Sequence, residues 1–140
     1  MSIRLASMAD LDAIARMNIE LRADEQIDNF MTDDQVKDRM REFLSGQAYK
    51  VHVFEVNDRI IGYSVVDVTK TPPYMRQFFI ARDSRRSGHG RAFFRLLARA
   101  LGADSIDVEV LVWNKGALEF YKHLGFVPRY VGLRARNRDR

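Results

Sequence analysis

The sequence predicts a single mixed α/β domain that spans residues 1–140, and three observations support this expectation. Stretches with the two-residue period of a strand alternate along the chain with stretches that have the period of a helix. The length is sufficient for one domain with its own hydrophobic core. The chain has no internal repeat, no low-complexity segment and no linker. We therefore expect one α/β domain rather than two.

The expected elements follow the order strand, two helices, three strands, helix, strand, helix, strand. They are a strand at residues 3–5, a helix from Asp10, a helix from Thr32 or Asp33 to Gly46, strands at 49–56, 59–68 and 77–81, a helix that follows Gly88 and Gly90 and ends at Gly102, a strand at 106–113, a helix from Asn114 to Gly125 and a strand at 126–134.

In the first half of the chain, apolar spacing and capping residues predict these elements. Apolar residues recur at helical spacing after Asp10. Thr32 and Asp33 are both good N-caps for a second helix, and Gly46 ends its apolar stripe. The two strands that follow alternate in polarity, and residues 57–58 (Asn-Asp) between them are a tight-turn signal.

In the second half, breakers and caps separate the elements. The Thr-Pro-Pro sequence at 71–73 interrupts the strand pattern before a short apolar run. Gly102 and Gly125 are expected to end the two helices, and Asn114 is a candidate cap for the second of them. Apolar residues at alternate positions predict the strand at 106–113.

The net charge of +4 is unevenly distributed. Acidic residues gather at 20–34, whereas basic residues gather at 82–99 and in the C-terminal tail. Such a polarised chain could present one face to anions and another to cations. The plainer interpretation is a solvated surface that ends in a frayed, arginine-rich tail.

Composition excludes several classes of chemistry. The chain has no cysteine, which excludes disulfides, thiolate catalysis and cysteine zinc sites. Its three histidines are isolated from one another in sequence, so we expect no metal site. No stretch approaches the roughly 20 apolar residues of a membrane span, and the N-terminus lacks the apolar core of a signal peptide. We expect a cytoplasmic protein.

A glycine-containing loop at 85–91 lies between a predicted strand and a predicted helix. Glycines let backbone N–H groups approach an anion closely, and a helix N-terminus adds partial positive charge. With Arg85, Arg86 and Arg91, this loop is a candidate pyrophosphate site. It is neither a Walker loop nor a dinucleotide fingerprint, and an ordinary turn is the alternative.

Residues 114–126 read N-K-G-A-L-E-F-Y-K-H-L-G-F, downstream of the R-x-x-G-x-G pattern that begins at Arg85. Together these two motifs resemble the GNAT superfamily of N-acetyltransferases. The resemblance covers nearly the whole chain, and its most specific part is 78–126. It implies a central, mostly antiparallel, twisted sheet flanked by about four helices, in which the strands at 77–81 and 106–113 splay apart.

The resemblance implies acetyl-CoA as a cosubstrate and no metal. Backbone amides of the loop would hold the pyrophosphate, and the end of the preceding strand would pair with the pantetheine arm. Asn114 matches a position that contacts the cofactor, while capping of the last helix is an equally open role. The cofactor-binding residues implied are Phe78, Phe79, Ile80, Arg85, Arg86, Ser87, Gly88, His89, Gly90, Arg91 and Asn114.

Two catalytic residues are also implied. Tyr121 matches the tyrosine that donates a proton to the departing thiolate, and a phenol with a pKa of about 10 keeps its proton at neutral pH. Glu109 is the candidate general base, with Asp107 as a weaker one. The alternatives are a core tyrosine and a half-exposed carboxylate paired with an arginine. Backbone N–H groups near residues 79–80 are the expected donors to the oxyanion.

The expected reaction is transfer of an acetyl group to a primary amine by direct attack on the thioester. We expect the acidic stretch at 20–34 to line the acceptor side and to attract a cationic amine. The acceptor itself is left open, as is a homodimer formed through the strand at 126–134. One alternative is a CoA-binding module without turnover. Another is a nucleic-acid binder, which the lack of a recognition motif disfavours.

Overall fold

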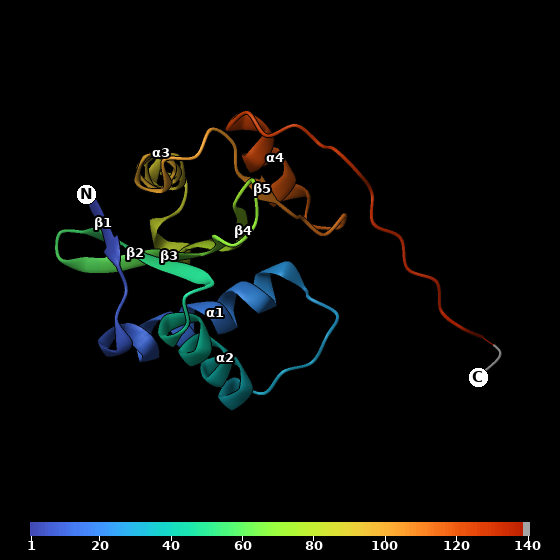
Figure 1. Cartoon of the computed structure of the whole chain (residues 1–140), viewed down its shortest axis with the longest axis horizontal. Helices are drawn as coiled ribbons and strands as arrows, with labels where there is room; N and C mark the ends of the chain where they lie inside the picture. The colour runs from blue at the N-terminus through green and yellow to red at the C-terminus, as the bar shows by residue number, and fades with distance from the viewer. Residues whose placement is uncertain (139–140) are drawn as a thin grey trace.

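The computed structural model describes residues 1–138 and confirms a mixed α/β fold (Figure 1). Five strands form one sheet in the order β1-β2-β3-β4-β5, with all neighbours antiparallel except the parallel pair β4 and β5. The strands are β1 (Ser2–Leu5), β2 (Tyr49–Val56), β3 (Arg59–Asp67), β4 (Tyr74–Ile80) and β5 (Asp107–Val108). The helices are α1 (Leu11–Glu25), α2 (Asp33–Ser45), α3 (His89–Leu101) and α4 (Lys115–His123), with short 3-10 helices at Met8–Asp10 and Arg82–Ser84.

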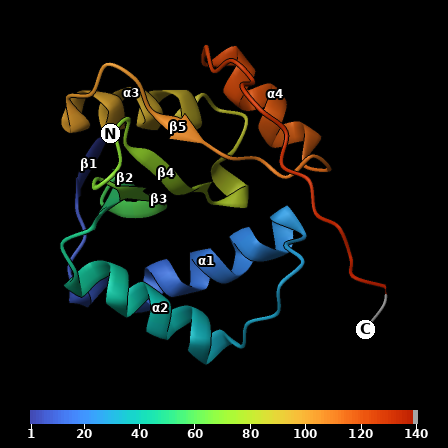
Figure 2. The ribbon, with the colours of Figure 1, turned by 45° about the vertical axis from the view of Figure 1, so that its right-hand side comes forward.

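The helices cover both faces of the sheet, as Figures 1 and 2 show from two sides. Helices α1 and α2 pack on one face, where Ile14, Met40 and Tyr63 are fully buried. Helices α3 and α4 lie on the other face, over a core that includes Phe93 and Leu97. Side chains alternate between the two faces of a strand, so the sequence of β2 to β4 supplies both cores.

Local sequence signals account for the best-predicted elements. The Thr32 side chain accepts a hydrogen bond from the Gln35 N–H at 3.1 Å, and the Gln35 side chain accepts one from the Thr32 N–H at 2.8 Å. This capping box starts α2 where predicted. Asn57 and Asp58 both adopt left-handed backbone angles (φ 53° and 62°), the conformation that a tight hairpin turn requires. No helix within residues 1–138 is long and apolar enough to cross a membrane.

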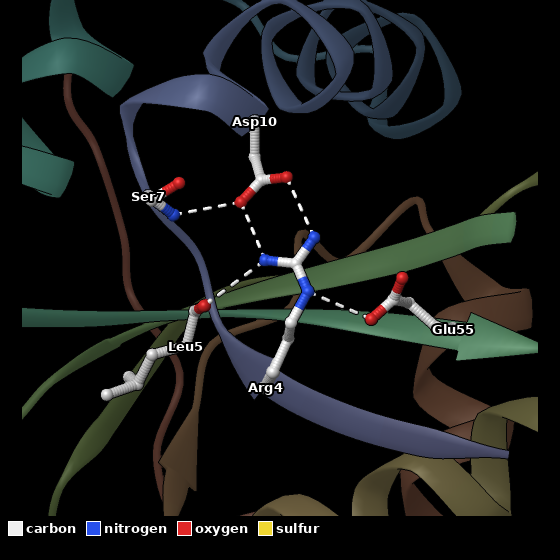
Figure 3. A network of polar contacts seen from close by, with 5 residues as sticks. All are labelled: Arg4, Leu5, Ser7, Asp10 and Glu55. Atoms are coloured by element: carbon white, nitrogen blue, oxygen red, sulfur yellow. Dashed lines mark hydrogen bonds and ion pairs between the residues drawn. The ribbon is translucent and has the colours of Figure 1, made fainter. Parts of the chain in front are cut away.

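The start of α1 is tied to the sheet through Arg4 and Asp10 (Figure 3). The Arg4 guanidinium donates two hydrogen bonds to the Asp10 carboxylate, at 2.8 and 2.9 Å, and a third to Glu55 at 2.9 Å. The Ser7 N–H also donates to Asp10 at 2.8 Å. These bonds hold the pKa of the Asp10 carboxyl below its usual range. They fix the turn through which β1 enters the α1 layer.

Strands β4 and β5 splay apart, as the family resemblance implied. They pair only at Tyr74 with Asp107 and at Met75 with Val108, and β4 then continues to Ile80 without a β5 partner in the described chain. The prediction of a strand over 106–113 is therefore wrong for most of its length. Alternating apolar residues indicate an extended segment, whereas a strand also needs a hydrogen-bonded neighbour.

The predicted final strand at 126–134 is also wrong. This segment is extended chain without a strand partner among the described residues, and it leads away from the body of the protein (Figures 1 and 2). Phe126 is half-buried against Tyr121, but the later large apolar side chains are exposed, including Val127, Val131 and Leu133. Because β5 is only two residues long, it cannot form a series of strand hydrogen bonds with this segment. A homodimer formed through this segment stays a prediction.

Candidate active site

The splay leaves one edge of β4 open at its C-terminal end. The Ala81 N–H donates to the Ile61 carbonyl on β3 at 2.7 Å, and Ile80 stands opposite Gly62. Backbone groups of successive strand residues point to opposite sides. Ile80 and Phe78 therefore turn their N–H and C=O groups towards the open edge, whereas those of Phe79 face β3. This places the expected oxyanion donor at Ile80 rather than Phe79.

The glycine loop leads from this edge into the N-terminus of α3. Arg86 and Gly88 both have left-handed backbone angles (φ 66° and 79°), and Gly88 is the N-cap residue without a side-chain cap. The first intrahelical hydrogen bond runs from the Ala92 N–H to the Gly88 carbonyl at 3.1 Å. The N–H groups before Ala92 are thus free of intrahelical partners, and the helix dipole adds positive potential there. This is the geometry of an anion site.

Most side chains of the loop stabilise the loop itself. The Arg85 guanidinium donates to the Ile80 carbonyl and to Asp24, each at 2.7 Å, and it lies over the Phe79 ring. His89 Nδ1 donates to the Ser84 carbonyl at 2.9 Å. Arg91 donates to the His123 carbonyl at the end of α4, at 3.2 Å. Hence these side chains are engaged within the protein, and the backbone remains the predicted anion contact.

The exposed side chains of Arg86 and Ser87, unlike those of Arg85 and Arg91, make no hydrogen bond within residues 1–138. Within residues 1–138, Arg86 has no side-chain partner. It is consequently the one basic side chain of the loop that could reach a bound anion without breaking an existing contact. The sequence alone could not separate it from Arg85 and Arg91, because that distinction depends on tertiary contacts.

Gly88 and Gly90 have different structural reasons to be glycine. Gly88 has a positive φ, and a Cβ there would meet nothing within 4 Å. At Gly90 a Cβ would lie 3.0 Å from the Phe120 ring of α4. Gly90 therefore permits the close approach of α3 to α4, and Gly88 provides the turn. Both were predicted as cofactor contacts, and only Gly88 can be substituted without disturbing α4.

A cavity of about 1170 Å³ is lined by the part of β4 that precedes this open edge, at Tyr74, Arg76 and Gln77. It is bounded by the end of α1, part of α2, the start of β4, the chain from 103 to 113, α4 and the start of the tail. The Trp113 indole N–H donates to the Glu25 carbonyl at 2.9 Å, which links the chain after β5 to the end of α1. The cavity lining includes Tyr121 and Glu109 together with Glu25 at the end of α1 and Asp28 just after it.

Tyr121 lines this cavity from α4 and is only 8% exposed. Its ring makes edge contacts with Phe78, Phe120 and Phe126. Burial, with the negative charge of Glu25, raises the pKa of the Tyr121 hydroxyl well above its usual value. The phenol is consequently protonated at neutral pH, the state that a proton donor needs.

Glu109 and Asn114 occupy less enclosed positions. Glu109 is exposed and accepts a hydrogen bond from the Tyr130 hydroxyl of the tail at 3.1 Å. Asn114 caps α4, since its side-chain oxygen accepts from the Ala117 N–H at 3.3 Å. Asp107 lies in β5 and also lines the cavity. The capping role of Asn114, one of the two left open by the sequence, is thus observed.

Glu25 is the titratable group that the sequence did not single out as catalytic. It is half-buried in the cavity wall, and burial raises its pKa above the usual carboxyl value. The salt bridges of the described residues do not include it, whereas Asp24 pairs with Arg82 and Arg85 and Asp28 pairs with Arg134. One signal in the sequence could have indicated it. Glu25 follows the buried Leu21 by one helical turn, so the two residues share a face of α1.

The site thus combines a parallel strand pair that opens, a helix N-terminus without a side-chain cap and a cavity lined by Tyr121. The model of the acetyltransferase (GNAT) domain family matches residues 19–134. The chain belongs to this family, and it is an acetyltransferase domain by class. A search of the curated proteins gave no match. Residues 1–138 contain no cluster of three or more metal-ligating side chains.

Solved structures share the fold over nearly the whole chain. A tetramutant of the BH1408 protein from Bacillus halodurans is 24% identical, with a TM-score of 0.81 over 98% of this chain and 100% of that one. A ribosomal-protein-alanine N-acetyltransferase from Brucella melitensis is 13% identical, with a TM-score of 0.74 over 97% and 99%. An aminoglycoside acetyltransferase from a soil metagenome is 16% identical, with a TM-score of 0.72 over 98% and 96%. At these identities the likeness establishes the fold.

Proposed function

We propose that this protein transfers the acetyl group of acetyl-CoA to a primary amine. The observation that carries the proposal is the position of the open β4 edge, which lies between the N-terminus of α3 and the cavity that contains Tyr121. A thioester that follows this edge would have its pyrophosphate at the helix N-terminus and its acyl group at the cavity. No other region of the described chain combines these features.

The cosubstrate would be held mainly by backbone. The N–H groups at the start of α3 suit a pyrophosphate, with Arg86 as the free side chain nearby. Pantetheine amides would pair with the free backbone groups of Phe78 and, in part, Ile80, as an added strand does. Arg85 already donates to the Ile80 carbonyl, so the Ile80 N–H is the group left to polarise the thioester carbonyl.

Two protons move in the proposed reaction. The amine nitrogen attacks the thioester carbonyl carbon, an oxyanion forms, and the carbon–sulfur bond then breaks. The Tyr121 hydroxyl gives its proton to the departing thiolate, and a carboxylate removes the proton that the attacking nitrogen loses. Positioning the two substrates in one cavity supplies much of the remaining rate enhancement.

Glu25 is favoured over Glu109 as that carboxylate. Glu25 is half-buried in the same cavity lining as Tyr121, and its raised pKa makes it a stronger base than an ordinary carboxylate. Glu109 is exposed and is engaged by the Tyr130 hydroxyl. Glu109 and Asp107 remain the alternative bases, and each lines the same cavity.

Calorimetric titration with acetyl-CoA tests the cosubstrate site. Gly88→Asp places a negative charge at the N-terminus of α3, and we expect acetyl-CoA binding to be lost. Gly102→Asp is the matched control, because Gly102 also has a positive φ (62°) and open space around it, at the opposite end of α3. Equal loss of binding in both variants, or binding retained in Gly88→Asp, would contradict the proposed site.

The same preparation separates the competing functions. CoA binding without acetyl transfer to any amine of a broad panel would instead support a binding module. Salt-dependent binding to DNA that CoA does not displace would instead support a nucleic-acid binder that uses the arginine-rich tail. Binding of acetyl-CoA followed by thiol release in the presence of an amine is the result that we expect.

A further inference from the structure

The wall of the cavity formed by α1 and α2 carries three buried hydrogen-bond donors without a partner among residues 1–138. They are Asn18 Nδ2, Arg22 Nη1 and Arg39 Nε. Asn18 is only 1% exposed, and all three residues line the same cavity. A buried donor without an acceptor costs free energy, so three of them in one cavity indicate that an acceptor group belongs there.

The positive charge at this wall has no carboxylate partner. Arg22 donates to the backbone and side-chain oxygens of Asn29, and Arg39 donates to Asn18 at 3.4 Å. Arg76, which lines the cavity from β4, donates to the Tyr49 hydroxyl at 3.2 Å. None of these three arginines forms a salt bridge in the part of the chain described, whereas Arg82 and Arg85 pair with Asp24.

The arginines also act on one another. Burial, followed by the charges of Arg76 and Arg22, lowers the pKa of Arg39. Five carboxylates also line the cavity: Glu25 at the end of α1, Asp28 just after it, and Asp104, Asp107 and Glu109 in and around β5. Glu25 lies near enough to oppose the lowering of the Arg39 pKa, although it does not form an ion pair. The α1–α2 wall therefore has an excess of buried positive charge.

We propose that the acceptor is an amine that also carries an oxyanion, a carboxylate or a phosphate, which binds to Asn18, Arg22 and Arg39. Guanidinium groups match both oxyanions through paired N–H donors, and an amide N–H adds a further donor. This inference rests on the proposed function, because the cavity is the acceptor side of that reaction. It replaces the expectation that the acidic stretch at 20–34 selects a purely cationic amine.

The arrangement also orients such an acceptor. Its oxyanion would bind Asn18, Arg22 and Arg39, and its amine would face Tyr121, which lines the same cavity from α4, with Glu25 at the end of α1. The site would then recognise both the amine and the oxyanion of the acceptor. A neutral amide or alcohol in place of the oxyanion would leave the three donors unpaired. Leaving buried donors unpaired costs more binding free energy than a small change in apolar contact does. The site would therefore discriminate strongly against the neutral analogue.

The test compares matched acceptors by thiol release. One arm pairs α-amino acids with their carboxamides, and a second pairs aminoalkyl phosphates with the corresponding amino alcohols. We expect kcat/KM at least tenfold higher for the anionic member of one arm, and that arm identifies the oxyanion. Arg39→Gln should abolish the preference. Lys37→Gln, a change on the same helix in a surface ion pair with Asp12, should preserve it.

A binding measurement makes the test independent of turnover. Acetate or inorganic phosphate is titrated into the free protein, and separately into the protein with excess CoA, at constant ionic strength while the arginine Nε–H signals are followed by NMR. Saturable shifts that disappear in Arg39→Gln, in a variant that keeps its melting temperature, support the proposal. Shifts that do not saturate, or equal turnover of anionic and neutral acceptors, would overturn it. Failure of the proposed function would instead appear as absent acetyl-CoA binding with the anion titration unaffected.

Discussion

The carboxylate of Asp24, in the last turn of α1, accepts a hydrogen bond from the guanidinium of Arg85 at 2.7 Å. Arg82 donates to the same carboxylate, and Arg85 also donates to the carbonyl of Ile80. Partial burial acts to raise the pKa of Asp24, but the bonds from Arg85 and Arg82 outweigh it and hold the pKa below its usual range. One carboxylate thereby joins the end of α1 to the loop that is expected to bind pyrophosphate.

This relationship predicts that Asp24→Asn weakens acetyl-CoA binding. Without the carboxylate, Arg85 loses its charged partner and the loop before α3 loses its link to α1. We expect an increase of about three- to tenfold in the acetyl-CoA Kd, measured by calorimetry, from the loss of charge-assisted hydrogen bonds. Asp12→Asn, which removes a surface ion pair with Lys37, is the control. An unchanged Kd in Asp24→Asn would show that the loop holds its shape without α1.

Tyr121→Phe is expected to reduce kcat by at least about 10²-fold, because the departing thiolate would lose its proton donor. The ring contacts of Tyr121 involve no hydroxyl, so the phenylalanine variant should keep its melting temperature and its acetyl-CoA affinity. If kcat stays within a factor of two in Tyr121→Phe, the tyrosine belongs to the core alone.

The dependence of activity on pH distinguishes Glu25 from Glu109. A general base must be deprotonated, so kcat/KM should fall as pH falls through the pKa of that base. Burial raises the pKa of Glu25 above its ordinary value of 4.5, which moves this fall towards neutral pH. We expect Glu25→Gln to lower kcat and to remove this acidic limb, and Glu109→Gln to retain it. The reverse result would assign the base to Glu109.

The sequence predicted those parts of the fold that local chemistry determines. The capping box of Thr32 and Gln35 and the left-handed turn at Asn57 and Asp58 each depend on residues within a few positions of one another. The position of Gly88 at the start of α3 is of the same kind. These elements appear where they were expected.

The sequence could not predict which extended segments find a partner. The segments at 106–113 and 126–134 have the alternation of strands, yet only Asp107–Val108 pairs with β4. The donors of Asn18, Arg22 and Arg39 come from two helices and meet only in the folded chain. Candidate residues near a motif could therefore be predicted, whereas the charge of the acceptor wall required the tertiary structure.

Stability provides a separate prediction at Asp10. Asp10→Asn removes the paired bonds from Arg4, and we expect the free energy of unfolding at pH 7 to fall by about 1.5–3 kcal/mol. The folded-state pKa of Asp10 lies below its ordinary value of 3.8, so this stabilisation is present above that value and is lost as pH falls through the folded pKa.

Urea unfolding of both proteins from pH 7 to pH 2.5 measures this change. The difference between the wild type and Asp10→Asn should be constant at neutral pH and should shrink below about pH 4. A difference that persists undiminished at the lowest pH would show that charge is not the source of the stabilisation.

The measurement that tests the central claim most directly follows both products of the reaction. Acetyl-CoA, the protein and an amino acid acceptor are incubated together, and the released thiol and the acetylated amine are quantified by absorbance and mass spectrometry. The proposed reaction predicts equal amounts of the two products, formed at a rate that Tyr121→Phe reduces. Thiol release without acetylated amine, or neither product from a protein that binds acetyl-CoA, would contradict amine acetylation.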